Sequence, residues 1–229
     1  MNESIKVVFF DLFFTLITPK YNDFKNENDV LGMTQEQWEI YAEDKELYMS
    51  RALGKERNPE TIIKDILKKA KVHSNKEQIN EILYLRQQRM KKALVEVDKE
   101  ILNVLLGIKN RNKKLCIISN ADVIDIMHWK DSPLNNFFDD TIFSCEVGFL
   151  KPNDRIYDIA LRTMGIKPNE GIFIGDGGSS ELEGAKSKGL STIMTTYLLK
   201  RDEKDKQVIG KFADYIVDDF KEILNVGCI

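Results

Sequence analysis

Polar side chains of the types needed for nucleophilic phosphoryl transfer follow several short apolar runs in this sequence. A carboxylate can attack phosphorus while a lysine, hydroxyl groups and backbone N–H groups hold the other phosphate oxygens. Taken singly, an aspartate after an apolar run is usually a turn residue or a helix cap, but together these positions favour one site. They are Asp11 and Thr15 after IKVVFF, Ser119 and Asn120 after LCII, Lys151 in GFLKP, and Gly175 and Asp176 after GIFI.

The apolar runs have the composition of strands buried in a parallel sheet, rich in β-branched and aromatic residues. The carboxyl ends of parallel strands meet at one edge of a sheet, which is where reactive side chains collect. The sequence therefore predicts an α/β fold with a doubly wound, parallel-sheet, Rossmann-like core. The predicted strands are 5–10, 115–118, 171–174 and 190–194, the predicted helices include 99–109 and 155–164, and a short strand and helix close the chain within 213–226.

The segment between the first and second strands is charged and has apolar residues at helical spacing, as at Ile62, Ile63, Ile66 and Leu67. Asn58-Pro59-Glu60 and the stretch 74–77 have the composition of helix starts. We expect an inserted helical unit. The predicted division is a catalytic core formed by residues 1–18 and 96–229, with a helical cap domain at 19–95.

The bulk composition disfavours several classes of protein. The 229 residues are 42% hydrophobic and 31% charged, with a net charge of −3, so the chain has no single-sign field to attract nucleic acid. No apolar run approaches a membrane span, and the N-terminal residues lack a signal peptide. Three widely spaced cysteines, Cys116, Cys145 and Cys228, fit free thiols in a reducing compartment. These features predict a cytoplasmic protein without a nucleic-acid or membrane partner, either monomer or homodimer.

The spacing of the polar positions resembles the motifs of the haloacid dehalogenase superfamily. The D-x-x-x-T motif corresponds to DLFFT, the Ser-Asn signature to SNAD, the motif lysine to GFLKP and the acidic loop to GDGGSSELEGA. The matches occur in the family's order from Ile5 to about Leu224, with the helical insertion where the family places its cap. The phosphatase-like branch of this family is the closest in pattern.

The resemblance implies a role for each matched residue. Asp11 would be the covalent nucleophile, and Thr15 would orient Asp11 or the phosphate. Ser119 and the Asn120 amide would hold the transferring group, and Lys151 would neutralise its charge.

The resemblance also implies a Mg²⁺ site. The ligands would be the carboxylates of Asp11 and Asp176 and the backbone carbonyl of Phe13, because Mg²⁺ prefers oxygen ligands and retains several waters. Glu181 would act behind these ligands by fixing Lys151 or a metal-bound water. Alternatively, Glu181 is only an acid placed favourably at a helix N-terminus.

Two positions after the nucleophile depart from the phosphatase pattern. Phosphatases of the family usually carry an aspartate two residues after the nucleophile as general acid and base, and here that residue is Phe13. Phe14 replaces the usual glycine. Phenylalanine cannot transfer a proton, and its presence is expected to reduce the rate by roughly 10²–10⁴-fold.

The departures leave two alternatives to a phosphatase open. An aromatic residue at position 13 is also found in the metal-independent 2-haloacid dehalogenase branch, but that branch carries no metal-binding acid at position 176 and needs an arginine near the cap. The candidate arginines are Arg51, Arg57, Arg86 and Arg89. The second alternative is a catalytically weak relative that binds a phosphorylated ligand.

Other patterns carry less weight. His73 and His128 have no catalytic or zinc-ligand spacing, and GDGGSS lacks the full dinucleotide-binding glycine pattern. The basic runs 68–71 and 200–206 indicate solvated surfaces. Aromatics of the predicted cap at positions 38, 41 and 48 are more typical of a core than of a substrate pocket. The sequence thus predicts Mg²⁺-dependent hydrolysis of a small phosphorylated metabolite.

Overall fold

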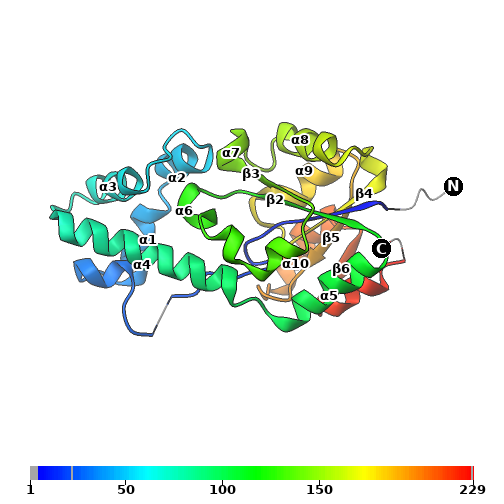
Figure 1. Ribbon diagram of the computed structural model, residues 1–229, viewed down its shortest axis with the longest axis horizontal. Coiled ribbons are helices and arrows are strands. Elements are labelled where there is room, and N and C mark those ends of the chain that lie inside the picture. Colours follow the sequence, from blue (N-terminus) through cyan, green and yellow to red (C-terminus); the bar gives the residue numbers. More distant parts are fainter. Residues whose placement is uncertain (1–4, 22, 228) are drawn as a thin grey trace.

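The computed structural model describes residues 5–21, 23–227 and 229, and its centre is a six-stranded, fully parallel sheet (Figure 1). The strand order is β3-β2-β1-β4-β5-β6, so the order reverses between β1 and β4. This topology confirms the predicted doubly wound α/β fold. The strands are Val7–Phe10 (β1), Lys114–Ser119 (β2), Asp140–Phe143 (β3), Gly171–Gly175 (β4), Ser191–Thr195 (β5) and Tyr215–Val217 (β6).

Alternating side chains of the central strands build two separate apolar layers, one on each face of the sheet. Val8 and Phe10 of β1 pack with the helix Lys99–Asn110 (α5), whereas Val7 and Phe9 pack with Asp154–Met164 (α8) and Glu181–Ser187 (α9). Figure 1 shows α8 and α9 on the side of the sheet opposite to α5. Burial on both faces explains why these strands appear in the sequence as continuous apolar runs.

The segment 19–95 contains helices and, among its described residues, no strand. Two of these helices begin where the sequence predicted. The Asn58 side chain accepts a hydrogen bond from the Thr61 N–H, with Pro59 at the first helical position. The Asn75 side chain accepts one from the Gln78 N–H. Figure 1 shows the α-helices of this segment to the left of the sheet. They are Gln35–Ala42 (α1), Lys45–Ala52 (α2), Pro59–Lys69 (α3) and Lys76–Val95 (α4), preceded by a 3₁₀ turn at Glu27–Leu31.

Two details differ from the sequence prediction. The edge strand β3 was not predicted, because DTIF offers only two apolar residues after a run that includes two aspartates. The closing helix is a 3₁₀ segment, Phe220–Asn225. The remaining short helices are Val123–Ile126 (α6), Ser144–Val147 (α7) and Glu203–Ile209 (α10).

Two of the three cysteines, Cys116 and Cys145, are buried and free, and Cys228 lies outside the described residues. Among the helices that the structure describes, none is long and apolar enough to cross a bilayer.

Candidate active site

The register of the sheet brings the predicted site residues to one edge. Phe10 pairs with Ile117 of β2 and with Ile174 of β4, and the Asp11 N–H donates to the Ile174 carbonyl over 2.9 Å. The residues that follow these strands therefore meet at the carboxyl edge, where the strand order reverses. In doubly wound sheets this reversal point is where ligands bind.

Asp11 is held by two neighbours and is only 5% exposed. The Thr15 hydroxyl donates to its Oδ2 over 3.0 Å and accepts from the Asp176 N–H over 3.0 Å, which ties the ends of β1 and β4 together. The Lys151 ammonium donates to Asp11 Oδ1 and, over 2.5 Å, to Glu181 Oε2. The structure thus brings Asp11, Thr15, Lys151, Asp176 and Glu181 into one cluster.

Glycines make room for the Glu181 side chain. A Cβ on Gly175 would lie 2.1 Å from Glu181 Oε1, so any other residue here would displace the carboxylate. The Gly177 N–H donates to the same oxygen over 3.0 Å. Glu181 is therefore fixed from both sides, by Lys151 and by the backbone of the glycine-rich turn.

The two residues of the Ser-Asn pair are placed differently. The Asn120 amide donates to the Lys151 carbonyl over 3.2 Å and accepts the Lys151 N–H over 2.8 Å, so it sets the position of the lysine loop. The Ser119 hydroxyl is buried and has no hydrogen-bond partner within the described chain. Asn120 lines the cavity above Asp11, whereas Ser119 does not. Contact of either with a substrate stays a prediction.

A divalent cation fits the donors at this edge of the sheet. Carboxylate oxygens of Asp11, Asp176 and Glu181 all lie within 4.8 Å of one another and are buried. When all three carboxylates are ionised, their negative charges face two cations, Lys151 and Arg201, so one negative charge remains to be balanced. An excess of buried negative charge in an all-oxygen cluster suits Mg²⁺.

The backbone carbonyl of Phe13 was predicted as a third metal ligand. The turn after β1 is closed by hydrogen bonds from the Ile17 N–H to the Leu12 carbonyl and from the Phe14 N–H to the Ile17 carbonyl. Within the described residues, no hydrogen bond goes to the Phe13 carbonyl. No protein donor in the described residues therefore competes with a cation for this oxygen, and its role as a ligand stays a prediction.

The ionisation of the cluster reflects burial and crowding of like charges. Burial raises the pKa of Asp11, with Asp176 adding to the rise and Lys151 opposing it. Burial and the Asp11 carboxylate raise the pKa of Glu181 to about 8. For Lys151, burial alone would lower the pKa, but the carboxylates of Asp11 and Glu181 outweigh it and keep the ammonium charged.

The raised Glu181 pKa predicts that the metal-free protein loses stability as pH rises. Between the ordinary glutamate pKa of 4.5 and about 8, the folded state holds a proton on Glu181 that the unfolded chain has lost. The free energy of unfolding should therefore fall across this window, by an amount on the order of 5 kcal/mol. Urea unfolding in EDTA at several pH values measures it. The fall should flatten in Glu181→Gln but not in the exposed control Glu183→Gln, and equal slopes in both variants would contradict the assignment.

Arg201 is a site residue that the sequence did not reveal. Its Nη2 donates to Asp176 Oδ2, and its Nε donates to the Asp176 carbonyl over 3.0 Å. The prediction that residues 200–206 form a solvated surface is wrong for Arg201, because its side chain is 15% exposed and paired with Asp176. Nothing in the local charge pattern distinguishes this arginine from its charged neighbours.

Three residues other than glycine adopt left-handed backbone conformations beside the site. Phe14, at the position where the family usually has glycine, has φ = 60°, and Ser179 and Ser180 have φ = 52° and 50°. Such conformations cost on the order of 1–3 kcal/mol each and cluster at functional sites. The backbone at position 14 therefore has a conformation that glycine would adopt without strain.

A cavity of about 820 Å³ opens above the carboxylate cluster. Its floor includes Asp11, Asn120, Lys151, Asp176 and Glu181, and Phe13 and Phe14 stand beside them. Helices of the segment 19–95, together with the chain before α1, form one wall of the cavity. This wall carries aromatic and basic side chains. They include Tyr21, Trp38, Tyr48, Arg51, Arg86 and Arg89.

The aromatic and arginine candidates divide between this cavity and other places. Trp38 and Tyr48 line the cavity, although Trp38 is also packed in the apolar cluster among the helices, where Tyr41 lies at the edge. Arg57 does not line the cavity, and its Nη2 donates to the Cys145 carbonyl over 2.6 Å.

Comparison with known proteins identifies a family and several relatives. The sequence model described as haloacid dehalogenase-like hydrolase matches residues 5–189. The glyceraldehyde 3-phosphate phosphatase of Methanothermobacter thermautotrophicus is 32% identical over 120 residues, covering 51% of this chain and 52% of the relative. The bifunctional epoxide hydrolase 2 of Rattus norvegicus is 39% identical over 84 residues, covering 34% of this chain and 15% of the relative. The chain therefore matches about half the length of the archaeal phosphatase and much less of the mammalian protein.

Solved structures share the fold at low sequence identity. The L-2-haloacid dehalogenase of Xanthobacter autotrophicus with covalently bound chloropropionic acid superposes with a TM-score of 0.66 at 14% identity, covering 97% of this chain and 98% of the other. A family enzyme from Bacteroides thetaiotaomicron, in complex with magnesium and inorganic phosphate, has a TM-score of 0.62 at 20% identity, with coverages of 87% and 98%. A dehalogenase and an enzyme solved with magnesium and phosphate therefore share the fold of this chain.

Proposed function

Because this chain belongs to the haloacid dehalogenase-like hydrolases, we propose that it is a Mg²⁺-dependent phosphatase that hydrolyses a small phosphorylated metabolite through an aspartyl-phosphate on Asp11. The observation that carries the proposal is the convergence of Asp11, Asp176 and Glu181 within 4.8 Å of one another beside Lys151. Carboxylates at this spacing repel unless cations hold them together. The archaeal phosphatase relatives support the same reaction class.

Asp11 is the nucleophile of the proposed reaction. Its carboxylate attacks phosphorus, a bond forms between the Asp11 oxygen and phosphorus, and the bond to the leaving oxygen breaks. Water then hydrolyses the acyl phosphate, which releases inorganic phosphate and restores the carboxylate. The Thr15 hydrogen bond orients Asp11, while Lys151 neutralises charge on the transferring group. Ser119 and Asn120 are assigned to the phosphate oxygens.

Asp11, Asp176 and the Phe13 carbonyl are the residues that would hold the metal. When bound, Mg²⁺ supplies charge neutralisation for a phosphate oxygen and brings together two carboxylates that would otherwise repel. Arg201 already neutralises part of the Asp176 charge from the outer side, and Glu181 holds Lys151 in place.

The proposal extends to the setting of the reaction. Residues 19–95 would act as a cap that excludes water and selects the substrate, since helices of this range line the cavity above Asp11. The buried free thiols of Cys116 and Cys145 support a reducing compartment such as the cytoplasm. The partner is a small phosphorylated molecule.

A metal-independent 2-haloacid dehalogenase is the rival function. Three of the four candidate arginines line the cavity, but each forms ion pairs with carboxylates: Arg51 with Glu43 and Asp122, Arg86 with Asp122 and Asp125, and Arg89 with Glu27. A metal-free reaction on a carboxylate substrate would also bring a further negative charge to a cluster of three buried carboxyl groups. These contacts favour the phosphatase.

One experiment separates the possible functions. Phosphate release from p-nitrophenyl phosphate and chloride release from 2-chloropropionate are measured side by side, with Mg²⁺ or with EDTA, and Asp11→Asn is the blank. We expect phosphate release that falls by roughly 10²-fold or more in EDTA, since a bound cation contributes several kcal/mol. Chloride release in EDTA would establish the dehalogenase instead. Activity on neither compound would favour a relative that only binds a phosphorylated ligand.

A further inference from the structure

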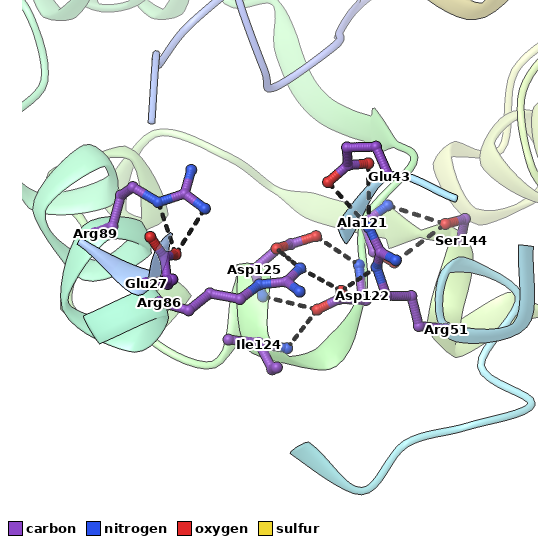
Figure 2. Close-up of polar contacts among 10 residues, drawn as sticks. All are labelled: Glu27, Glu43, Arg51, Arg86, Arg89, Ala121, Asp122, Ile124, Asp125 and Ser144. Carbon is purple, nitrogen blue, oxygen red and sulfur yellow. Dashed lines mark hydrogen bonds and ion pairs between the residues drawn. The ribbon is translucent and has the colours of Figure 1, made fainter. Parts of the chain in front are cut away.

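Two arginines of the helical segment converge on a single carboxylate of the loop after β2, as Figure 2 shows. Arg51 of α2 places its Nε 3.0 Å from Asp122 Oδ2, and Arg86 of α4 places its Nη2 2.6 Å from the same oxygen. Both arginines are more than nine-tenths buried, with exposures of 3% and 5%, and Asp122 is 1% exposed. The two guanidinium groups are therefore held close together inside the protein.

Asp122 links these arginines to the floor of the cavity. Its other oxygen, Oδ1, accepts from the N–H groups of Ile124 and Asp125 over 2.8 and 3.2 Å and caps helix α6. Asp122 lies two residues after Asn120, whose side chain holds the backbone of Lys151. The position of both arginines is thus set relative to the cluster around Asp11.

Each arginine has one N–H donor without an acceptor among the described residues. Arg51 Nη1 and Arg86 Nε are buried and have no hydrogen-bond partner in the described part of the chain. Both residues line the cavity that has Asp11 on its floor. By contrast, Arg89 in the same wall donates to Glu27 through both Nε and Nη2. Buried donors without acceptors are rare and call for a ligand or a bound water.

The charges of the pair are already balanced by protein carboxylates. Asp122 and the largely buried Asp125 face the two guanidinium groups. The Nη2 of Arg51 also donates to both carboxylate oxygens of Glu43, which is 60% exposed. A neutral acceptor oxygen can therefore satisfy these donors, and no further negative charge is needed. A hydroxyl or carbonyl oxygen meets this requirement.

We propose that Arg51 and Arg86 bind the leaving group of the substrate through a hydroxyl or carbonyl oxygen, so that the substrates are phosphate esters of polyols or hydroxyaldehydes and not of hydrocarbon alcohols. This inference rests on the proposed function, since the ester must lie with its phosphate at Asp11. Arginine suits the task because its planar fork can keep one N–H on Asp122 while another donates to the ligand.

Binding of two matched esters tests the inference. Isothermal titration calorimetry of Asp11→Asn protein with Mg²⁺ compares glycerol 3-phosphate with propyl phosphate, which has the same three carbons and no hydroxyl groups. We expect glycerol 3-phosphate to bind about tenfold more tightly, as hydrogen bonds to charged donors provide. Arg51→Lys and Arg86→Lys, which keep the charge beside Asp122 but lose the fork, should each reduce this ratio to about three or less.

Arg57→Lys is the matched control, because Arg57 also joins the helical segment to the core but does not line the cavity. It should keep the tenfold ratio. Equal affinities for the two esters, no binding of glycerol 3-phosphate, or a ratio that survives both cavity replacements would overturn the inference. Where one replacement prevents folding, the other carries the test, and equal affinities in the parent protein overturn the inference by themselves.

The same samples separate this inference from the proposed function. Hydrolysis of p-nitrophenyl phosphate by the wild type with equal binding of both esters would leave the phosphatase standing and remove the role of the arginines. A tenfold binding ratio without hydrolysis of any ester would support the leaving-group site and contradict the proposed reaction.

Discussion

Asp11→Asn should abolish phosphate release from p-nitrophenyl phosphate while leaving the protein folded. The amide is not a nucleophile, so we expect kcat to fall by about 10⁴-fold or more, as when nucleophilic catalysis is removed from other hydrolases. Asparagine has nearly the same shape and can still accept the Thr15 hydrogen bond at the remaining oxygen. Initial rates with saturating Mg²⁺ give the effect.

The stability of this variant provides an independent check on the electrostatics. Removing one of three buried carboxylates relieves repulsion from Asp176, and Lys151 keeps Glu181 as a partner. The melting temperature of metal-free Asp11→Asn should therefore equal or exceed that of the wild type. Asp158→Asn on the surface of α8 is the control for removal of a carboxylate away from the site. Retained activity in Asp11→Asn would exclude the covalent route.

The central strands and the residues after them were predictable because their signals are local. Buried strands β1 and β4 leave uninterrupted apolar runs, and a polar residue after each run must lie at the carboxyl edge of a parallel sheet. The convergence of Asp11, Lys151 and Asp176 follows from this rule and from the motif spacing. The division of the chain into a core and a cap at residues 18 and 96 remains a prediction.

The features that the sequence did not predict depend on contacts between distant parts of the chain. Edge strand β3 carries two buried apolar residues, too few to form a pattern. The side chain of Arg201 pairs with Asp176, which lies 25 residues away in the sequence, and Arg86 pairs with Asp122, 36 residues away. Sequence periodicity describes which face an element buries, but it does not say which charged side chain on one element will reach a carboxylate on another.

Phe13→Asp tests whether the missing general acid limits the reaction. Phe13 lies beside Asp11 in the cavity and is partly buried against the core. An aspartate there would lie near other carboxylates, which raise its pKa and help it to hold a proton for the leaving oxygen. For an alkyl ester such as glycerol 3-phosphate, we expect kcat to rise by about 10²-fold or more, because general acid catalysis contributes 10²–10⁴-fold.

The comparison of two leaving groups separates proton transfer from other effects of this replacement. Nitrophenolate leaves without much help from an acid, so the rate with p-nitrophenyl phosphate should change by less than about tenfold in Phe13→Asp. Phe13→Asn makes the same change in size and polarity but cannot donate a carboxyl proton. Equal rates of the Asp and Asn variants on glycerol 3-phosphate would mean that leaving-group protonation does not limit the wild type. A higher rate on glycerol 3-phosphate in Phe13→Asp than in Phe13→Asn would instead show that the general acid is the one catalytic group that the Asp11 site lacks.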